Sequence, residues 1–600
     1  MFPAVDQLVA YCLVPLALFI VFNGLDDLVI DAALAWNWYR KRPEQLPVTP
    51  LAEKRIAILV PLWKEAGVIG GMIRHNISAI RYSSYDFFIG AYPNDLATLA
   101  AIRELEDRFS NVHLAICPHD GPTSKADCLN WIYQRVLLHE EERSERFDIF
   151  VTHDAEDLIH PDALAGLNRY CGEYGMVQVP VLPLTTPARD IVHGIYCDEF
   201  AEYQTRDIPS RQNLGSFLPS NGVGTGFSRG ALRRLAESSA NRIFEPECLT
   251  EDYENGLRLH RLGIRQRFLP LTGGHNPVAT REYFPRTRRG AIRQRTRWIT
   301  GICLQSLERN GWHGPLRDTY WLWRDRKGLL TNPVSVLANA CFVWGIFSWA
   351  AAHLTGSPWE LGRSSPHSIL LPAVALLAAY RVGIRMQCTS RYYGWRFALL
   401  VPIRTICANY INAVATFSAL WRYTRARLRG QPLVWLKTEH AYPSRLALLA
   451  HKRRLSEILI GSGYLAEEEI TRALTACGSE ERLGEFLVRT GLLSEEIWCE
   501  VLSLQQGLPA IRIAPREVER RAVRTLPRMV ASDFHVLPFR LVDGALFVAT
   551  PQAPGAEVAA ALQRFTRLRV MFHLTTASNF RQLEHAFGPA SDPRYSEKNG

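Results

Sequence analysis

The twelve cysteines of this 600-residue chain form no CxxC pair and no spacing typical of a metal site. Their scatter predicts reduced thiols in a cytoplasmic protein. No basic residue precedes the first long apolar run, so a cleaved signal peptide is not expected. Neither a basic recognition helix nor an aromatic and basic RNA-binding strand stands out, so we expect no nucleic-acid partner. Charged residues make up 21% of the chain and hydrophobic ones 47%, which excludes an intrinsically disordered protein.

Charge is missing from three long stretches of the chain. The stretches without any acidic or basic residue are Gln7–Leu25, Gly328–Trp359 and Ser364–Tyr380. A bilayer core about 30 Å thick is crossed by a helix of roughly 17–25 apolar residues. We therefore predict membrane spans near residues 6–25, 332–353 and 367–384, with a buried core helix as the alternative for the first two. The mean hydropathy of −0.07 is then an average over membrane and soluble parts.

A further apolar stretch, residues 395–421, carries Arg404 in its middle. A central Arg costs a spanning helix at least about 2.5 kcal/mol. Basic residues favour cytoplasmic ends, and they follow both the first span (Arg40–Arg42) and this stretch (Arg422–Arg429). We therefore predict an interfacial helix along the inner leaflet. The alternative is a fourth span, which would export the C-terminal domain.

Residues 52–310 have the pattern of an α/β domain. Runs typical of buried strands alternate with helical periodicity in the order Arg55–Pro61, 66–80, Tyr85–Gly90, 95–109 and Val112–Ile116. This alternation predicts a doubly wound, mostly parallel sheet. Ligands of such sheets bind at the carboxyl ends of the strands, which is where this sequence places its polar residues.

The first polar cluster is Asp154–Asp157, which directly follows the apolar strand Phe147–Thr152. Carboxylates packed at a strand end repel one another unless a cation lies between them. Mg²⁺ and Mn²⁺ prefer such oxygen ligands and often bridge to substrate phosphates. The alternative is a solvated acidic turn with helix N-caps for the segment that begins near residue 161.

Two more polar clusters follow. In Thr250–Glu254 the acids begin a predicted helix at 251–262, and capping by Thr250 would explain the cluster without any chemistry. In Arg293–Trp298 the guanidinium groups suit diphosphate oxygens and Trp298 offers a flat face for a sugar. The alternative there is the basic face of a helix beside the membrane.

Together and in this order, the clusters resemble the membrane-embedded family-2 glycosyltransferases, which include cellulose and hyaluronan synthases. That family's marks stand here as Val60-Pro61, Asp154-Ala155-Glu156, Thr250-Glu251-Asp252 and Gln294-Arg295-Thr296-Arg297-Trp298. The second acid of the D-x-D mark is Glu156, so the sequence leaves open whether Glu156 or Asp157 reaches a metal. Tyr92–Asp95 and Gln431–Thr438 are closer still to the branch of bacteriophage adsorption protein B, which joins such a transferase to a cyclic-di-GMP sensor.

The resemblance implies a GT-A-like domain that transfers a sugar with inversion from a nucleotide-diphosphate donor, for which we expect UDP. It implies Asp252 as the catalytic base with Glu251 beside it, and Mg²⁺ or Mn²⁺ on Asp154 and Glu156. The substrate-binding positions that it implies are Pro61, Glu65, Asp95, Lys125, Asp127, Gln294, Arg297 and Trp298. Lys125 belongs to a loop that the family places near the nucleotide, and Asn221–Phe227 resembles its Gly-rich loop on the acceptor side.

The C-terminal part contains a tandem unit. Arg454–Glu468 aligns with Arg482–Glu496 at an offset of 28 residues, and each copy predicts a short amphipathic helix ended by Gly. The unit resembles the N-terminal domain of type II secretion ATPases in its cyclic-di-GMP-binding form, although Ser456 stands where that family has Gly. The ligand contacts that it implies are Arg454, Leu455, Leu459, Gly463, Arg482, Leu483, Gly484, Leu487 and Gly491. The alternative is a helical adaptor that binds nothing.

Residues 510–590 predict a small α/β partner of this unit, with strands near Val536–Phe539 and Ala545–Ala549. The polar tail Ser591–Gly600 is expected to be disordered. The expected architecture is thus a GT-A-like α/β sheet with membrane helices and a C-terminal helical and α+β regulatory domain. Its parts are an N-terminal membrane helix (1–30), the transferase domain (52–310), two membrane helices with the interfacial helix (328–421) and the cyclic-di-GMP-binding domain (445–590).

The expected function is an inverting glycosyltransferase that builds a surface polysaccharide and is activated by cyclic-di-GMP. We expect it to be a multi-pass protein of the bacterial inner membrane, with the catalytic and regulatory domains in the cytoplasm. Its expected partners are a nucleotide sugar, a glycan or polyprenyl-phosphate acceptor, cyclic-di-GMP, the membrane, and an outer-membrane or periplasmic export protein. The alternatives are transfer of a single sugar to a polyprenyl phosphate and a catalytically inactive membrane scaffold or receptor component.

Overall fold

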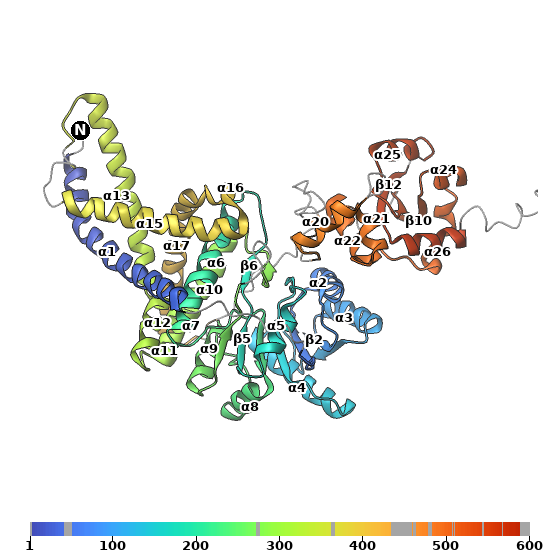
Figure 1. Ribbon diagram of the computed structural model, residues 1–600, viewed down its shortest axis with the longest axis horizontal. Coiled ribbons are helices and arrows are strands. Elements are labelled where there is room, and N and C mark those ends of the chain that lie inside the picture. The colour runs from blue at the N-terminus through green and yellow to red at the C-terminus, as the bar shows by residue number, and fades with distance from the viewer. Residues whose placement is uncertain are drawn as a thin grey trace, which may run out of the picture. The chain divides into compact units, whose positions relative to one another are not determined.

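The computed structural model divides the chain into two compact units. The first holds Met1–Asn76 and Ile80–Tyr442, and the second holds Ile77–Ala79 and Pro443–Gly600. The described residues are 3–40, 51–271, 277–359, 361, 367–431, 433, 459, 464–477, 483–506, 508, 510–542, 545–566 and 568–587. The predicted tail Ser591–Gly600 lies outside them. Figure 1 labels the elements along the chain.

A seven-stranded sheet forms the centre of the first unit. Its strand order is β3-β2-β1-β4-β7-β5-β8. The strands are β1 (Ile56–Pro61), β2 (Tyr85–Ala91), β3 (Val112–Ile116), β4 (Ile149–Thr152), β5 (Met176–Gln178), β7 (Thr225–Ser228) and β8 (Gln266–Phe268). β1 to β4 pair in parallel, and β7 is antiparallel to both β4 and β5. The predicted mostly parallel, doubly wound sheet is therefore confirmed, with one antiparallel strand that the sequence did not indicate.

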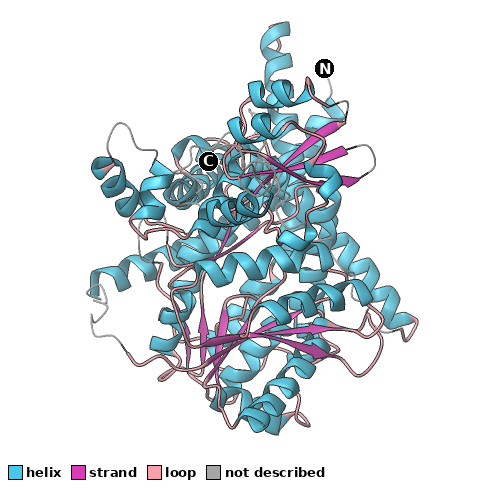
Figure 2. Ribbon diagram, turned by 90° about the vertical axis from the view of Figure 1, so that its right-hand side faces the viewer, coloured by secondary structure: helices cyan, strands magenta, loops and turns pink. Residues whose placement is uncertain are grey.

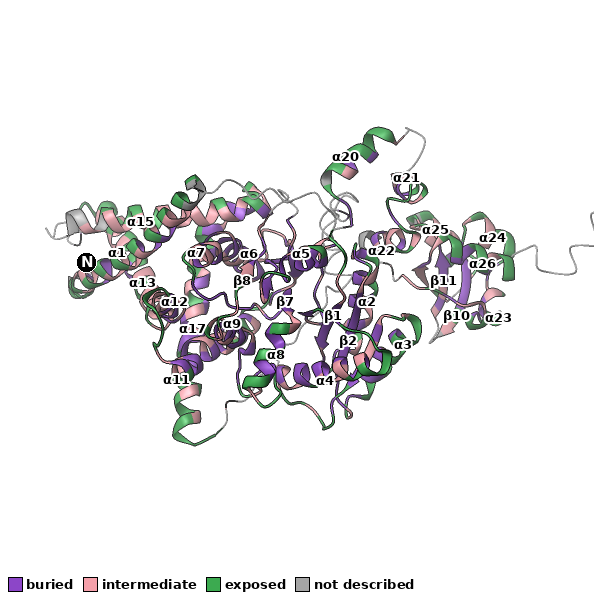
Figure 3. Cartoon of the chain, turned by 60° about the horizontal axis from the view of Figure 1, so that its bottom comes forward, coloured by how far each residue is buried: buried purple, intermediate pink, exposed green. Residues whose placement is uncertain are grey.

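Helices cover both faces of this sheet (Figure 2). The central strands β1, β2 and β4 are buried on both faces, as their near-continuous apolar runs predict (Figure 3). The first helices are α2 (Ala66–Ala79), α3 (Leu96–Arg108), α4 (Lys125–Arg143) and α5 (Ala163–Tyr170), and a small parallel pair is made by β6 (Val181–Pro183) and β9 (Thr280–Glu282). The later ones are α6 (Ile191–Glu202), η1 (Tyr203–Asp207), α7 (Ile208–Asn213), α8 (Arg229–Ser238), α9 (Glu251–Arg261), α10 (Arg288–Trp298), η2 (Ile299–Gln305), α11 (Ser306–Asn310) and α12 (Leu316–Arg326). Here η1 and η2 are π-helical segments.

Two described helices are long and apolar enough to cross a membrane: Ala4–Trp36, within α1 (Pro3–Arg40), and α13 (Gly328–Thr355). Only 22% and 6% of the residues in their most apolar windows are buried, which distinguishes them from core helices of a soluble protein. The third predicted span falls in α15 (His367–Tyr393), which is not one of these two. Figure 1 shows α1, α13 and α15 extending together away from the sheet.

The stretch around Arg404 forms α16 (Trp395–Ala398) and α17 (Val401–Leu428), and α17 packs against α13, α10 and α6. Arg404 is 0% exposed. Its Nε and Nη2 donate to the carboxylate of Asp198, in α6, over 2.6 and 2.8 Å. The central Arg therefore has a counter-ion in α6, so α17 does not carry an unpaired charge.

Replacing Asp198 by Asn is expected to destabilise the protein by about 3–5 kcal/mol, because Arg404 would remain as a buried, unpaired charge. Thermal unfolding of the detergent-solubilised protein measures the change. Glu308→Gln is the matched control, since its pair with Arg427 is exposed at 43% and 45% of the two side chains. An exposed pair contributes about 0.2–1 kcal/mol. Equal shifts in the two variants would contradict the prediction.

The second unit combines a helical part with a small sheet. Its helices are α20 (Glu467–Ala476), α21 (Leu483–Arg489), α22 (Glu495–Gln506), η3 (Pro515–Glu517), α23 (Arg520–Val523), α24 (Arg528–Asp533), α25 (Ala556–Gln563) and α26 (Ala577–Phe587). The sheet pairs β10 (Leu537–Val542) antiparallel with β11 (Ala545–Thr550) and β11 parallel with β12 (Arg569–Leu574). Both predicted strands are present. α20 and α22 begin at Glu467 and Glu495, which keeps the offset of the tandem unit.

Candidate active site

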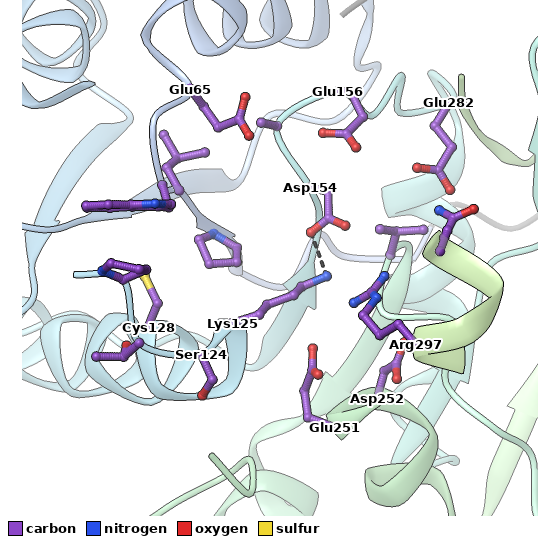
Figure 4. A pocket seen from close by; sticks show the side chains of 18 of the residues that line it. Glu65, Ser124, Lys125, Cys128, Asp154, Glu156, Glu251, Asp252, Glu282 and Arg297 are labelled. Carbon is purple, nitrogen blue, oxygen red and sulfur yellow. Dashed lines mark ion pairs between the residues drawn. The ribbon is translucent and has the colours of Figure 1, made fainter. Parts of the chain in front are cut away.

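The predicted motifs meet in one pocket at the carboxyl ends of β1 and β4. Pro61 ends β1, and Asp154 and Glu156 follow β4. The other predicted residues that line the pocket are Glu65, Lys125, Glu251, Asp252, Gln294, Arg297 and Trp298. Figure 4 shows acidic side chains on two sides of the pocket, with Lys125 and Asp154 between them. Segments far apart in the sequence therefore present their polar groups to a common space.

Lys125 lies at the centre of this pocket, as the first residue of α4. Its Nζ lies 2.6 Å from Asp154 Oδ1 and donates to the Gly222 carbonyl over 3.4 Å. Burial lowers the pKa of Lys125, but the charges of Asp154 and Glu251 outweigh burial and raise this pKa above its ordinary value. The ammonium group therefore stays charged and is suited to a diphosphate.

Glu156, and not Asp157, is the second acid of this segment that faces the pocket. Asp157 is 0% exposed, and its Oδ2 accepts from the backbone N–H of Asp154 over 2.9 Å and is hydrogen-bonded to His153 Nδ1 over 2.7 Å. Burial, followed by the charges of Asp154 and Glu156, raises the pKa of Asp157 well above its ordinary value. Asp157 thus shapes the turn, and because Glu156 is buried as well, a solvated acidic turn is the wrong description.

The donor set fits a divalent cation that is held together with a phosphate ligand. Asp154 and Glu156 supply the hard carboxylate oxygens that Mg²⁺ and Mn²⁺ prefer, and the Lys125 ammonium already holds positive charge against Asp154. In the described ranges, no three acids, histidines or cysteines lie close enough to form a complete metal cage. Mg²⁺ commonly binds through one or two carboxylates and completes its shell with phosphate oxygens and water.

Glu251 and Asp252 form the first turn of α9. Thr250 is the N-cap residue but makes no side-chain capping bond, so the predicted cap is wrong. The reason is close packing, because a Cβ on Gly301 of η2 would lie 2.4 Å from Thr250 Oγ1. Asp252 Oδ1 instead accepts the backbone N–H of Tyr253 over 2.8 Å.

Helix α10 presents unpartnered polar atoms to the pocket. Gln294 Oε1 and Arg297 Nε are buried and form no hydrogen bond within the described part of the chain. Arg295 plays a different role, since its Nη1 and Nη2 donate to Glu199 over 3.2 and 2.7 Å. Buried polar groups are rarely left without partners, so Gln294 and Arg297 are the members of this motif that are prepared for a ligand.

Two predicted substrate-binding residues lie outside this pocket. Asp95 is the N-cap of α3 and accepts the backbone N–H of Lys64 over 2.6 Å, which fixes the loop that leads to Glu65. Asp127 accepts the Thr123 hydroxyl over 2.7 Å and lines a neighbouring pocket. Their roles toward a nucleotide stay predictions.

Sequence reasoning gave no role in the site to several residues that line the pocket, among them Trp63, Tyr92, Glu282 and Phe284. The rings of Trp63 and Tyr92 meet edge to face at 5.4 Å between centroids, and Trp298 lies edge-on to Phe284 at 6.4 Å. Tyr92 belongs to a motif that the resemblance singled out. Glu282 lies in β9, which no local pattern marks, so its position depends on tertiary structure alone.

The activity that the sequence predicts for this pocket is expected to decline on the acid side of neutrality. Burial, followed by the charge of Asp252, raises the pKa of Glu251 to about 7, and burial also raises the pKa of Asp252. A carboxylate with a raised pKa takes up its proton as the pH falls through that raised value, and the first proton goes to Glu251, which leaves Asp252 as the carboxylate. The base is lost when Asp252 is protonated as well, at a lower pH but above the ordinary pKa of an Asp carboxyl. We expect kcat/KM to fall about tenfold per pH unit below that point. A profile that stays flat down to about pH 4, the ordinary pKa of an Asp carboxyl, would contradict this expectation.

The predicted cyclic-di-GMP site lies in the second unit and is only partly described. The predicted contacts that lie outside the described residues are Arg454, Leu455, Gly463 and Arg482. One apolar cluster contains Leu459, Leu483 and Leu487. Gly491 follows α21 with φ +72°, as expected of a glycine that ends a helix. A Cβ on Gly484 would lie 1.9 Å from the Trp498 ring, so packing of that ring requires glycine here.

Family models match two regions of the chain. The model described as glycosyltransferase-like family 2 matches residues 54–301, and that of the MshEN domain matches residues 506–592. The first range contains every residue described above as lining the pocket. The second begins at Gln506, the last residue of α22, so the match leaves out nearly all of the tandem unit of α20, α21 and α22.

Curated relatives match nearly the whole chain. Bacteriophage adsorption protein B of Escherichia coli strain K12 is 33% identical over 595 residues, which cover 93% of this chain and 79% of that protein. Bacteriophage N4 adsorption protein B of Escherichia coli O157:H7 gives the same values.

Two solved structures each match a part of the chain. A mannosyltransferase from Pyrobaculum calidifontis, in complex with GDP-mannose and Mn²⁺, is 19% identical with a TM-score of 0.43, and the match covers 68% of this chain and 98% of that one. MshE, solved with cyclic-di-GMP, is 24% identical with a TM-score of 0.21, and the match covers 22% of this chain and 99% of that one.

Proposed function

We propose, since the chain belongs to the family of bacteriophage adsorption protein B and is a glycosyltransferase of the family-2 type, that it transfers a sugar from a UDP-linked donor to a glycan acceptor with inversion. The observation that carries this proposal is the pocket itself. It joins a carboxylate pair, a buried ammonium group, a buried acid and an arginine with an unpartnered Nε. These are the groups that such a transfer requires.

The acceptor hydroxyl is a weak nucleophile at neutral pH, and Asp252 is the group that takes its proton. A positioned base contributes typically about 10²–10⁴-fold to the rate. Asp252 lies in the pocket wall formed by the first turn of α9. The hydroxyl oxygen attacks the anomeric carbon as the bond to the diphosphate breaks. In-line attack inverts that carbon, so an α-linked donor gives a β-linked product.

The leaving diphosphate gains negative charge that the protein has to stabilise. Lys125 and Arg297 supply two positive groups in the pocket, and Gln294 adds a side-chain amide. Charges fixed in a buried site stabilise such a leaving group without reorganisation. A Mg²⁺ or Mn²⁺ ion on Asp154 and Glu156 would act as a Lewis acid toward the same oxygens.

We further propose that this reaction takes place at the cytoplasmic face of the bacterial inner membrane and extends a surface polysaccharide. The two apolar helices α1 and α13 and the buried pair of Arg404 with Asp198 support a transferase part that sits directly on the membrane. The MshEN domain supports cyclic-di-GMP as the regulatory ligand. A ligand that favours one arrangement of the second unit would raise the rate by shifting its population.

The test is nucleotide release by the full-length protein in detergent, with separate UDP-sugars and GDP-sugars, with and without cyclic-di-GMP. We expect turnover with a UDP-sugar, dependence on Mg²⁺ or Mn²⁺, and a higher rate with cyclic-di-GMP. Proton NMR of the product would report the anomeric configuration. Adding either an oligosaccharide or a polyprenyl phosphate identifies the acceptor class.

Three outcomes would overturn parts of this proposal. Turnover with GDP-sugars alone would exclude the UDP-linked donor. Unchanged cyclic-di-GMP binding in the Arg454→Ala and Arg482→Ala double variant would exclude the tandem unit as its site. Absence of turnover with every donor, in a protein that still binds them, would favour an inactive membrane scaffold.

A further inference from the structure

We propose that Asp325 and Arg211 are positioning residues for Asp252 and act on it through Tyr253. The inference rests on the proposed function, because it takes Asp252 as the catalytic base. Neither residue lines the catalytic pocket, and neither belongs to a motif that the sequence marks. Their effect on the base follows from a short chain of contacts.

Tyr253 connects the base to the interior of the transferase part. Its backbone N–H donates to Asp252 Oδ1 over 2.8 Å, and its hydroxyl donates to Asp325 Oδ2 over 2.7 Å. Its side chain is buried, with 4% of the residue exposed, so the ring cannot turn away freely. Any shift of the hydroxyl is therefore transmitted to the backbone that aims Asp252.

Arg211 fixes the position of Asp325. Its Nη1 and Nη2 donate to the two carboxylate oxygens over 3.0 and 2.9 Å. The guanidinium group also lies 3.9 Å from the centroid of the Phe217 ring and donates from Nε to the Phe217 carbonyl over 2.7 Å. A bidentate pair sets both a distance and a plane, so Asp325 presents Oδ2 to Tyr253 in one orientation.

Helix α12, which carries Asp325, is anchored by the preceding residue as well. Arg324 pairs with Asp207 over 2.8 Å, and with Asp26 and Asp27 of α1 over 2.5 and 3.0 Å. Adjacent residues of α12 thus bind the first membrane helix and the tyrosine that follows the base. The helix cannot slide without breaking these ion pairs.

The base needs such support because its neighbour in the turn, Glu251, is a buried acid. Glu251 and Asp252 are both in the first turn of α9, and like charges in a buried site repel. A misplacement of about 1 Å in a catalytic group can cost about 10²-fold in rate. The bonds made by Tyr253 hold one carboxylate in place against that repulsion.

Tyr253→Phe is the sharpest test, because it removes one hydroxyl and leaves no buried charge. We expect kcat to fall about 10-fold to 100-fold, with the donor KM and nucleoside-diphosphate binding within about twofold of the original. We also expect the acid limb of the pH profile of kcat to shift, because Tyr253, which is hydrogen-bonded to Asp252, loses its own bond to Asp325. Tyr82→Phe is the matched control, because its hydroxyl makes a 2.7 Å bond to the Lys54 carbonyl away from the pocket.

Asp325→Asn is a second test of the contact between Tyr253 and Asp325. It should lower kcat in the same direction, and a thermal melt separates that loss from misfolding caused by the unpaired Arg211. Unchanged kcat and an unchanged pH profile in folded Tyr253→Phe would overturn the inference, as would an equal loss in Tyr82→Phe. If Asp252→Asn itself retained full turnover, the proposed base would be wrong. Loss of activity in Asp252→Asn with none in Tyr253→Phe would reject only the positioning role.

Discussion

Asp252→Asn is expected to abolish transfer while the protein still binds its donor. The asparagine has nearly the shape of the original side chain, and its amide oxygen can still accept the Tyr253 N–H that Asp252 Oδ1 accepts over 2.8 Å. Only the capacity to take a proton is lost, and a general base contributes typically about 10²–10⁴-fold. The loss should appear in kcat, with the donor dissociation constant unchanged by calorimetry.

Glu254→Gln is the matched control for this variant. Glu254 lies in the same helix, and its Oε2 accepts from Asn310 Nδ2 over 2.8 Å, a bond that glutamine can keep. We expect its kcat to remain close to that of the original protein. Normal turnover by Asp252→Asn would exclude Asp252 as the base. Equal losses in both variants would mean that α9 tolerates no neutral replacement, and the role of Asp252 would not be catalytic.

Gly222→Ala is expected to cause the second large loss of activity. Gly222 has φ +77°, and a Cβ there would lie 2.7 Å from Asp252 Oδ2 and 3.4 Å from Lys125 Nζ. The methyl group would push Asp252 away from its position and disturb the Lys125 ammonium group that is paired with Asp154. A displacement of about 1 Å costs about 10²-fold, so kcat should fall by at least that factor.

Gly263→Ala separates this contact from backbone strain. Gly263 has φ +72°, nearly the same conformation, but a Cβ there would meet no described atom within 4 Å. Both variants carry the strain of a left-handed alanine, about 1–2 kcal/mol, which a thermal melt measures. Only Gly222→Ala should lose activity beyond what that strain causes. Similar kcat values in the two variants would show that Gly222 does not form the wall beside the base.

The sequence predicted much of the sheet because its central strands are buried on both faces and therefore read as continuous apolar runs. It did not predict β7, whose Thr225–Ser228 looks like the end of a Gly-rich loop. A Cβ on Gly226 would lie 2.8 Å from Leu167, so the glycine marks close packing within a strand. Such packing is a tertiary property that local patterns do not show.

The sequence predicted those site residues whose type alone indicates their chemistry. It left undecided those residues whose role depends on the folded geometry. The choice between Glu156 and Asp157 needed the turn that buries Asp157 against His153. The partner of Arg404 is Asp198, which lies far away in the sequence and carries no local signal. Capping of α9 by Thr250 was the alternative for its cluster, but Thr250 makes no side-chain capping bond and packs closely against Gly301 of η2.

The ion pairs of α1 affect whether this enzyme can be shortened to a fragment without that helix. Asp26, Asp27 and Asp31 of that helix face Arg206 and Arg324, whose side chains are only 3% and 9% exposed. A shortened version that begins after α1 would remove two of the three counter-ions of Arg324 and two of the four of Arg206. Breaking a buried ion pair by removing one partner costs about 3–5 kcal/mol, and a whole domain is stable by only about 5–15 kcal/mol. The first helix therefore stabilises the fold of the enzyme, and gene fusions or domain transplants that discard it are expected to lose much of the stability of the transferase.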